Sequence, residues 1–271
     1  MDLDLQTAHK AVRLYLRQRS VSLVGFRDHE PHEVGSATCI QIAGRFFLAT
    51  AAHVILAYPN EQLLIVHGGV GPLPILNRGV RGGNTTDVDD IAWLEVSEDT
   101  AARTGKTFIP LSHLHIGLAH DPDLWTLMYG FPSELVDTTQ LVQQELDVTP
   151  LVYSTGTISQ ENWPDGCDPD VDVVLNYPNT NNKLEDGRDY QLPDPYGMSG
   201  GGFWFVTPKT GLIWHPEAHL FGIDRAWWPG SRYARGTQIQ HWLNILGEDI
   251  PELLLIIRSH VEANSLNTTS A

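Results

Sequence analysis

Cysteine is nearly absent from this chain. Its 271 residues include only Cys39 and Cys167, so at most one disulfide is available and neither cysteine sits in a metal-type pair. Apolar runs are short, and none approaches the ~20 residues that a membrane-spanning helix requires. The acidic start, Met1 to Asp4, has no apolar signal segment behind it. These absences lead us to expect a cytoplasmic protein with no membrane partner.

Basic residues are also scarce. The chain carries 17 Lys and Arg against 33 Asp and Glu, a formal net charge of −16, so we expect no nucleic-acid partner. Histidine occurs 12 times, and the groups 113–115 and 29–32 each contain two histidines. Neither group is accompanied by a third and fourth ligand, so we expect surface histidines, no metal and no cofactor.

Long helical segments are missing from the middle of the chain, where no βαβ unit is visible. Short β-type runs separated by turn signals predict an all-β fold of barrels or sandwiches, with Ala43-Gly44 as a hairpin turn and 79–83 as a glycine-rich loop. The segment 101–118 is expected to connect two halves. The expected strands are 21–24, 35–42, 45–50, 63–66, 74–76 and 87–96, then 124–132, 151–158, 171–175, 203–206, 211–214 and 218–223.

Helical spacing of apolar residues occurs only near the two ends. Residues 3–19 predict one helix with basic residues toward its end, and the apolar face from Ile239 to Leu246 predicts a second, ending at Gly247. A further helix is expected from Pro251 to about His260, followed by a polar tail without regular structure.

The stretch 196–203 is the most informative in the chain. Ser199 lies among Gly197, Gly200, Gly201 and Gly202, and an apolar run follows it. Glycine permits backbone conformations that other residues resist, so the stretch predicts a tight turn that presents a hydroxyl. If the N–H groups of Gly197 and Ser199 point into one small space, they form the oxyanion hole that acyl transfer requires.

Two further residues have the chemistry to activate this serine. His53 follows the small residues at the end of one expected strand, and Asp90 is the last acid before the apolar part of another. Serine is a weak nucleophile until a base removes its proton, and imidazole titrates near neutrality. A carboxylate then orients the imidazole and stabilises its charged form. His53, Asp90 and Ser199 are therefore the expected catalytic residues.

The three motifs together resemble the chymotrypsin-like (trypsin-like) serine peptidases, most closely the bacterial and intracellular branches. The matching stretches are Thr50 to His53, Asp90 to Leu94 and Gly197 to Gly201, with support from Gly35-Ser36, 129–132 and 220–223. The resemblance implies two six-stranded antiparallel β-barrels with the active cleft between them. The expected divisions are an N-terminal helix (1–19), a first barrel (20–115), a second barrel (116–236), C-terminal helices (237–262) and a polar tail (263–271).

The chain departs from the family at two positions. Met198 stands directly before the serine, where digestive trypsins carry an acid that pairs with a newly released N-terminus, so activation by that ion pair is not expected. Pro193 stands six before the serine, where trypsins place their specificity acid. Pro193, Asp194 and Asp224 are the candidate residues of the substrate pocket, and either carboxylate could attract a basic side chain.

The resulting functional prediction is a serine endopeptidase that acts on a protein or peptide substrate, of narrow specificity or controlled by a regulatory protein partner. One alternative is a trypsin-like binding or regulatory module without turnover. Another is an α/β-hydrolase-type esterase, because Gly197-x-Ser199-x-Gly201 also fits a nucleophile elbow and Asp224 and His241 follow it in that fold's order.

Overall fold

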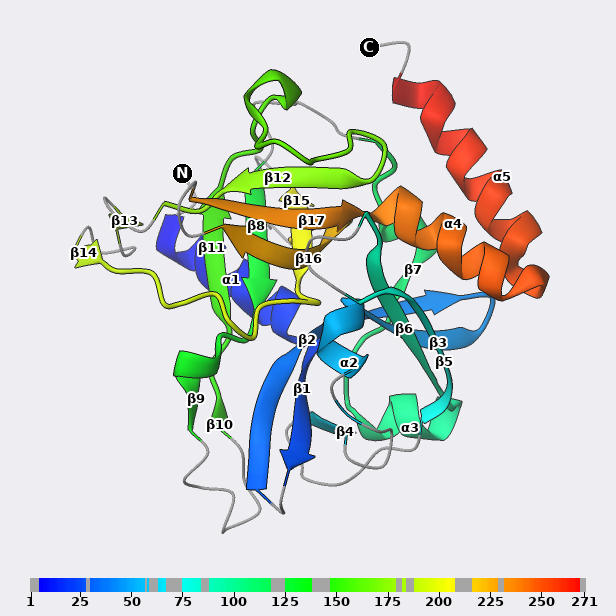
Figure 1. The fold of residues 1–271 in the computed structure, drawn as a ribbon, viewed down its shortest axis with the longest axis horizontal. Helices are drawn as coiled ribbons and strands as arrows, with labels where there is room; N and C mark the ends of the chain where they lie inside the picture. The colour runs from blue at the N-terminus through cyan, green and yellow to red at the C-terminus, as the bar shows by residue number, and fades with distance from the viewer. Residues whose placement is uncertain are drawn as a thin grey trace.

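Two β-sheets form most of the molecule, and its helices lie mainly toward the ends of the chain (Figure 1). This computed structural model describes residues 5–27, 30–56, 58, 63–66, 75–83, 88–117, 125–137, 147–178, 182–183, 188–207, 216–228 and 232–268. Within those ranges, no helix combines the length and apolar character needed to cross a bilayer.

The first sheet has the strand order β4-β1-β2-β3-β6-β5, with antiparallel pairing between neighbours. A short seventh strand, β7, pairs in parallel with β2. Ala43 and Gly44 join β2 to β3 with φ values of 51° and 79°, which confirms the expected hairpin turn. The strands are β1 (Ser20–Arg27), β2 (Glu30–Ile42), β3 (Arg45–Thr50), β4 (Leu63–Val66), β5 (Ile75–Gly82), β6 (Asp90–Val96) and β7 (Ile109–Pro110).

The second sheet is six-stranded, antiparallel, and ordered β11-β8-β15-β16-β17-β12. A bridge between Thr157 and Leu175 links the regions of its two edge strands. Its strands are β8 (Trp125–Gly130), β11 (Leu151–Thr155), β12 (Asp172–Asn176), β15 (Gly202–Val206), β16 (Ala218–Trp228) and β17 (Tyr233–Gln238). Two small ladders accompany it, formed by β9 (Val136–Asp137) with β10 (Asp147–Val148) and by β13 (Asn182–Lys183) with β14 (Asp189–Tyr190).

Three apolar clusters hold these elements together. One is formed by residues of the first sheet and its helices and includes Leu48 and Leu94. Another is formed mainly by residues of the second sheet and includes Met128 and Phe203. The largest joins both sheets to the terminal helices, and Trp242 in this cluster donates from its indole to Ala92 O at 3.2 Å. Because burial of apolar surface is the main stabilising term in folding, this shared cluster fixes one sheet against the other.

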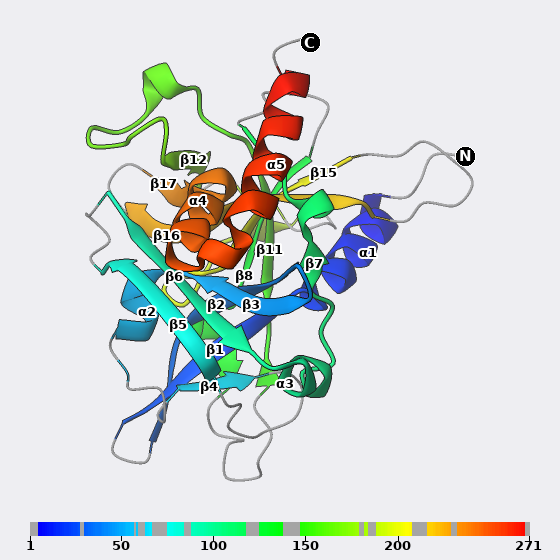
Figure 2. The ribbon, with the colours of Figure 1, turned by 90° about the vertical axis from the view of Figure 1, so that its right-hand side faces the viewer.

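The helices cover the outside of the sheets (Figure 2). They are α1 (Leu5–Arg17), α2 (Ala52–Leu56), α3 (Glu98–Arg103), α4 (Ile239–Asp249) and α5 (Pro251–Thr268). Although α1 begins the described chain, it packs on the second sheet, where His9 lies 5.5 Å from the Trp125 ring. Figure 1 shows α4 and α5 together at one side of the molecule.

The all-β fold with terminal helices confirms the sequence prediction, but several details differ from it. Strand β17 was not expected. Residues 79–82, expected in a loop, belong to strand β5, and the Trp93 indole occupies the space where a side chain of residue 79 would stand, 2.2 Å from an added Cβ. Helix α3 occupies part of the expected connection 101–118, since Ser97 caps its N-terminus. The helix α5 continues to Thr268, so residues 263–268 are helical and not part of a tail. Residues 52–56 form α2, so His53 lies in a short helix after β3 rather than at the end of a strand. The expected strand 211–214 lies outside the described residues.

Candidate active site

His53 and Asp90 form a direct pair between α2 and the start of β6. Asp90 Oδ2 lies 2.7 Å from His53 Nδ1, and Asp90 Oδ1 accepts from the His53 backbone N–H at 3.0 Å. The side chain of Asp90 is completely buried, while 28% of the His53 side chain is exposed. With Nδ1 donating to the carboxylate, Nε2 is left as the ring's acceptor. The pair therefore presents a base oriented by a buried acid.

The serine turn requires glycine at two positions. Gly197 and Gly200 have φ values of 91° and 89°, in the region that other residues avoid. A Cβ on Gly200 would lie 1.9 Å from Ser36 O and 2.2 Å from Thr50 Oγ1. A Cβ on Gly197 would lie 2.7 Å from Phe131 O. The turn is therefore pressed against neighbouring backbone that leaves no room for side chains.

Two backbone amides in this turn have no acceptor among the described residues, and they are those of Gly197 and Ser199. The neighbouring amides are used: Met198 N donates to Pro195 O at 2.9 Å, and Gly200 N donates to Asp224 O at 2.7 Å. Successive backbone N–H groups without a protein acceptor in a tight turn are available to an anion, which is the arrangement that an oxyanion hole requires.

The directions of these two amides are fixed through their own peptide planes. The carbonyl of Tyr196 accepts from Ser133 N at 2.8 Å, which orients the planar peptide that carries the Gly197 N–H. The carbonyl of Met198 accepts from Gly201 N at 2.8 Å and orients the Ser199 N–H in the same way. The donors are therefore preorganised rather than free to rotate.

Ser36 and Thr50 hold the serine turn against the segment that carries His53. Ser36 N donates to Ser199 O at 2.8 Å, and Ser36 Oγ donates to Gly197 O at 2.8 Å. Thr50, three residues before His53, donates from its hydroxyl to Ser36 O at 2.8 Å. The half-buried side chain of Ser199 makes no hydrogen bond to a described residue, so its hydroxyl is not bonded to the His53 ring.

Met198 anchors the turn by apolar packing. Its side chain is 1% exposed and belongs to the cluster of the second sheet, together with Met128 and Leu151. Where an acidic residue would need an ionic partner in this position, the thioether needs only apolar neighbours. The turn therefore adopts its shape without a released N-terminus.

The three candidate pocket residues lie in different environments. Pro193 is buried, and its carbonyl accepts from the Tyr177 hydroxyl at 3.0 Å. Asp194 is exposed and uses its carboxylate to accept from Tyr196 N at 2.9 Å, within its own loop. Asp224 is only 4% exposed and lies directly behind the serine turn, where its backbone N–H donates to Gly201 O at 2.8 Å.

The carboxyl group of Asp224 is unusual because its Oδ1 has no partner among the described residues. Burial raises the pKa of Asp224 well above the usual aspartate value, because the charged form loses its hydration there. Burial therefore favours the protonated, uncharged form of this carboxyl, which is a hydrogen-bonding group.

His241 does not take the position that an α/β-hydrolase mechanism would require. Its Nε2 lies 2.7 Å from Asp89 Oδ1. His241 is therefore paired with a carboxylate from the first half of the chain and not with Asp224. The serine turn also leads into strand β15 and not into a helix. The nucleophile-elbow interpretation is therefore wrong, because that elbow needs a helix directly after the serine.

The remaining histidines lie apart from this site. His113 stacks on His219 with ring centroids 5.8 Å apart. In the described parts of the chain, no group of three or more His, Cys, Asp or Glu residues is arranged to hold a metal ion. His29 and the side chain of His32 are outside the described set.

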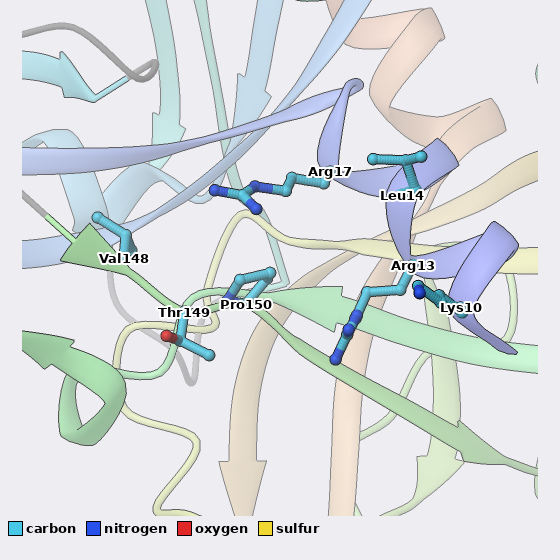
Figure 3. A pocket seen from close by; sticks show the side chains of 7 residues that line it. All are labelled: Lys10, Arg13, Leu14, Arg17, Val148, Thr149 and Pro150. Atoms are coloured by element: carbon cyan, nitrogen blue, oxygen red, sulfur yellow. The ribbon is translucent and has the colours of Figure 1, made fainter. Parts of the chain in front are cut away.

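A cavity of about 290 Å³ lies on another part of the surface (Figure 3). One wall is the basic face of α1, with Lys10, Arg13, Leu14 and Arg17, and the other is the segment 148–150. No residue of the three motifs lines it, so this cavity is separate from the His53–Asp90 pair.

The sequence predicts His53, Asp90 and the serine turn as site residues, and the structure bonds His53 to Asp90, but the sequence does not predict the residues that support them. Ser36 was noted only as part of a supporting match, and Thr50 only as part of the histidine motif. The buried Arg225 behind the site carries no local signal, because its partners are far away in the sequence: Val88 O at 2.7 Å and the Asp172 carboxylate.

Comparison with known proteins supports the fold and goes no further. No protein-family model and no curated protein sequence matches the chain. Among solved structures, the scabies mite inactivated protease paralogue S-I1 matches with a TM-score of 0.55 and 11% identity, over 88% of this chain and 96% of that one. Two structures of heparin binding protein, one named as human, match with TM-scores of 0.53 and 0.51 and identities of 11% and 12%, over 89% of this chain and 93% of each. The chain therefore has a trypsin-like fold.

Proposed function

We propose that the protein is a serine endopeptidase that hydrolyses peptide bonds through an acyl-enzyme intermediate. Ser199 Oγ attacks the substrate carbonyl carbon while His53 Nε2 accepts the hydroxyl proton. His53 then returns that proton to the leaving amine as the C–N bond breaks, and water hydrolyses the resulting ester by the reverse sequence. Asp90 orients His53, and the N–H groups of Gly197 and Ser199 bind the oxyanion.

The observation that carries this proposal is the pair of unbonded, oriented amides at Gly197 and Ser199. A turn that served only to connect two strands would gain stability by pairing these groups, since a hydrogen bond contributes about 1 kcal/mol. Their position beside a serine, in a turn tied to the His53 segment, fits a site that binds developing negative charge. The His53–Asp90 hydrogen bond at 2.7 Å supports the same assignment.

The competing proposal is a trypsin-like module that binds a partner without turnover. A neighbour of the same fold is named an inactivated protease paralogue, so the fold alone does not decide between the two. The presence of serine, histidine and aspartate at the three motif positions favours the enzyme. The absence of a hydrogen bond from Ser199 to His53 is compatible with an enzyme too, because catalytic contacts often tighten only when substrate binds.

The state of the serine turn bears on activation. Because Met198 is already packed in the apolar cluster, we propose that the enzyme is active without proteolytic release of a new N-terminus. Narrow specificity or a regulatory partner would then restrain it.

Asp224 bears on specificity. Because burial favours the uncharged form of this carboxyl, Asp224 would recognise a substrate side chain by hydrogen bonding rather than by charge attraction. We therefore propose that Asp224 favours polar, uncharged side chains over Lys or Arg, and that the exposed Asp194 contributes little.

A fluorophosphonate probe tests the chemistry at Ser199. Intact mass spectrometry of the labelled protein should show one adduct on the wild type and none on Ser199→Ala. A wild type that resists the probe with and without cell extract, as Ser199→Ala does, would favour the silent module. Mapping new protein N-termini in cells that express either form then identifies substrates, and identical maps would remove the support for a peptidase.

A further inference from the structure

A group of buried charges lies behind the candidate active site. Asp172 is completely buried and accepts from two arginines, Arg225 on one carboxylate oxygen and Arg235 on the other. The side chains of Arg225 and Arg235 are 0% and 3% exposed. Burying charge is costly unless it is paired, so the positions of these groups are tightly determined.

The two arginines differ in their second contact. Arg235 also donates to Gly166 O at 3.1 Å, a carbonyl of the second half of the chain. Arg225 donates to Val88 O at 2.7 Å, two residues before Asp90 in the first half. Arg225 alone of the two therefore connects Asp172 to the segment that carries the catalytic acid.

Arg225 is also adjacent in sequence to the residue behind the serine turn. Its neighbour Asp224 accepts from Gly200 N at 2.7 Å and donates to Gly201 O at 2.8 Å. Arg225 is thus bonded through its side chain to the segment before Asp90. Its chain neighbour Asp224 is bonded through the backbone to the two glycines after Ser199. A displacement of Arg225 would reach both motifs.

The charges indicate why an arginine is present at this position. The Asp90 carboxylate is completely buried, and among the described residues it accepts hydrogen bonds from His53 alone. With neutral His53, the buried negative charge needs another compensating group. Burial lowers the pKa of Arg225, and the charges of Asp172 and Asp90 both oppose that decrease, so Arg225 and Asp90 interact electrostatically. Arg225 and Arg235 then balance Asp172 and Asp90.

We propose that Arg225 is a positioning residue for the hydrolysis: its guanidinium holds the Val88–Asp90 segment in place and places a positive charge near the buried Asp90 carboxylate behind His53. This inference rests on the proposed function of the site. It assigns to one side chain both the alignment of the acid and its charge balance.

Arg225→Met and Arg235→Met form a matched pair that tests the inference. Each removes one guanidinium from Asp172, but only Arg225→Met removes the contact with Val88 O. The first readout is the proton NMR signal of His53 Nδ1–H, assigned by its loss in His53→Ala, because it reports the bond to Asp90 without any turnover. The second is the rate of fluorophosphonate labelling at Ser199.

Arg225→Met should shift or abolish the His53 signal and slow labelling by at least about tenfold, the loss expected from a misaligned acid. Arg235→Met should leave the signal in place and label at nearly the wild-type rate. An unchanged signal in Arg225→Met, or equal effects in the two variants, would overturn the inference. If the wild type is not labelled, the proposed function fails, while the NMR comparison still decides the role of Arg225.

Lysine variants keep the test decisive if a methionine variant does not fold. Arg225→Lys and Arg235→Lys retain the charge, but a single ammonium cannot span two acceptors as a guanidinium does. Arg225→Lys should then shift the His53 signal less than Arg225→Met does, and it should still slow the labelling of Ser199. Arg235→Lys should change neither the signal nor the labelling rate. Equal behaviour of the two lysine variants would refute the positioning role.

Discussion

The hydroxyl of Ser36 offers a sharp test of how the serine turn is held. Ser36 is completely buried, donates to Gly197 O at 2.8 Å and accepts from Phe131 N at 2.9 Å. Ser36→Ala removes both bonds and leaves a buried carbonyl and a buried N–H without partners. It changes the side chain by one oxygen atom, so the effect of packing is small.

The expected loss follows from those two groups. A buried polar group left unpaired costs about 1–3 kcal/mol, so the loss of two partners in Ser36→Ala should lower the free energy of unfolding by about 2–6 kcal/mol. Urea titration measures this change, and the denaturant dependence should stay the same because the surface exposed on unfolding is unchanged. Ser112→Ala is the control, since Ser112 is exposed and, within the described part of the chain, its hydroxyl bonds only to the neighbouring His113, at 3.3 Å.

The same substitution should affect the chemistry. Loss of the bond to Gly197 O loosens the turn, so labelling of Ser199 should slow, but by less than the ~10²–10³ that follows complete removal of one oxyanion donor. If Ser36→Ala unfolds within about 0.5 kcal/mol of the wild type, as ordinary surface substitutions do, and is labelled at the same rate, our account of the turn is wrong.

Three further predictions concern single residues. Asp90→Asn should fold but lose about 10⁴-fold in labelling rate, because an amide facing Nδ1 favours the wrong tautomer; a loss below tenfold would contradict this. Gly200→Ala should lower the melting temperature strongly, since its Cβ would lie 1.9 Å from Ser36 O, whereas the control Gly156→Ala has open space around it. Asp224→Asn should remove a pH dependence of stability. Folding raises the Asp224 pKa, so the wild type should lose stability as pH rises from the unfolded aspartate pKa of about 4 through the folded value. A series of urea titrations from about pH 4 upward should show this loss in the wild type and not in the variant.

The sequence predicts the fold class well because the evidence for it is local. Alternating apolar runs and turn residues such as Ala43-Gly44 define strands and hairpins, and the glycine turn, His53 and Asp90 each carry a recognisable neighbourhood. The structure then shows which of these neighbourhoods bond to one another.

The parts that sequence reasoning missed depend on contacts between distant residues. Ser36 and Gly197 are 161 positions apart, and Arg225 and Val88 are 137 positions apart, so no local sequence pattern predicts either hydrogen bond. Residue 79 was assigned to a loop because glycine is a turn signal, whereas in the structure it makes room for the Trp93 indole. The continuation of α5 past residue 262 was missed because its residues are polar, although polar residues continue a helix readily.

The central claim is that His53 and Ser199 act as one catalytic unit. The direct test measures hydrolysis of a substrate peptide by the wild type, His53→Ala, Ser199→Ala and the double variant. A shared mechanism predicts that all three variants lose about the same large factor, because residues that act as a unit are not additive. Losses that multiply in the double variant, or a wild type no faster than Ser199→Ala, would contradict the claim.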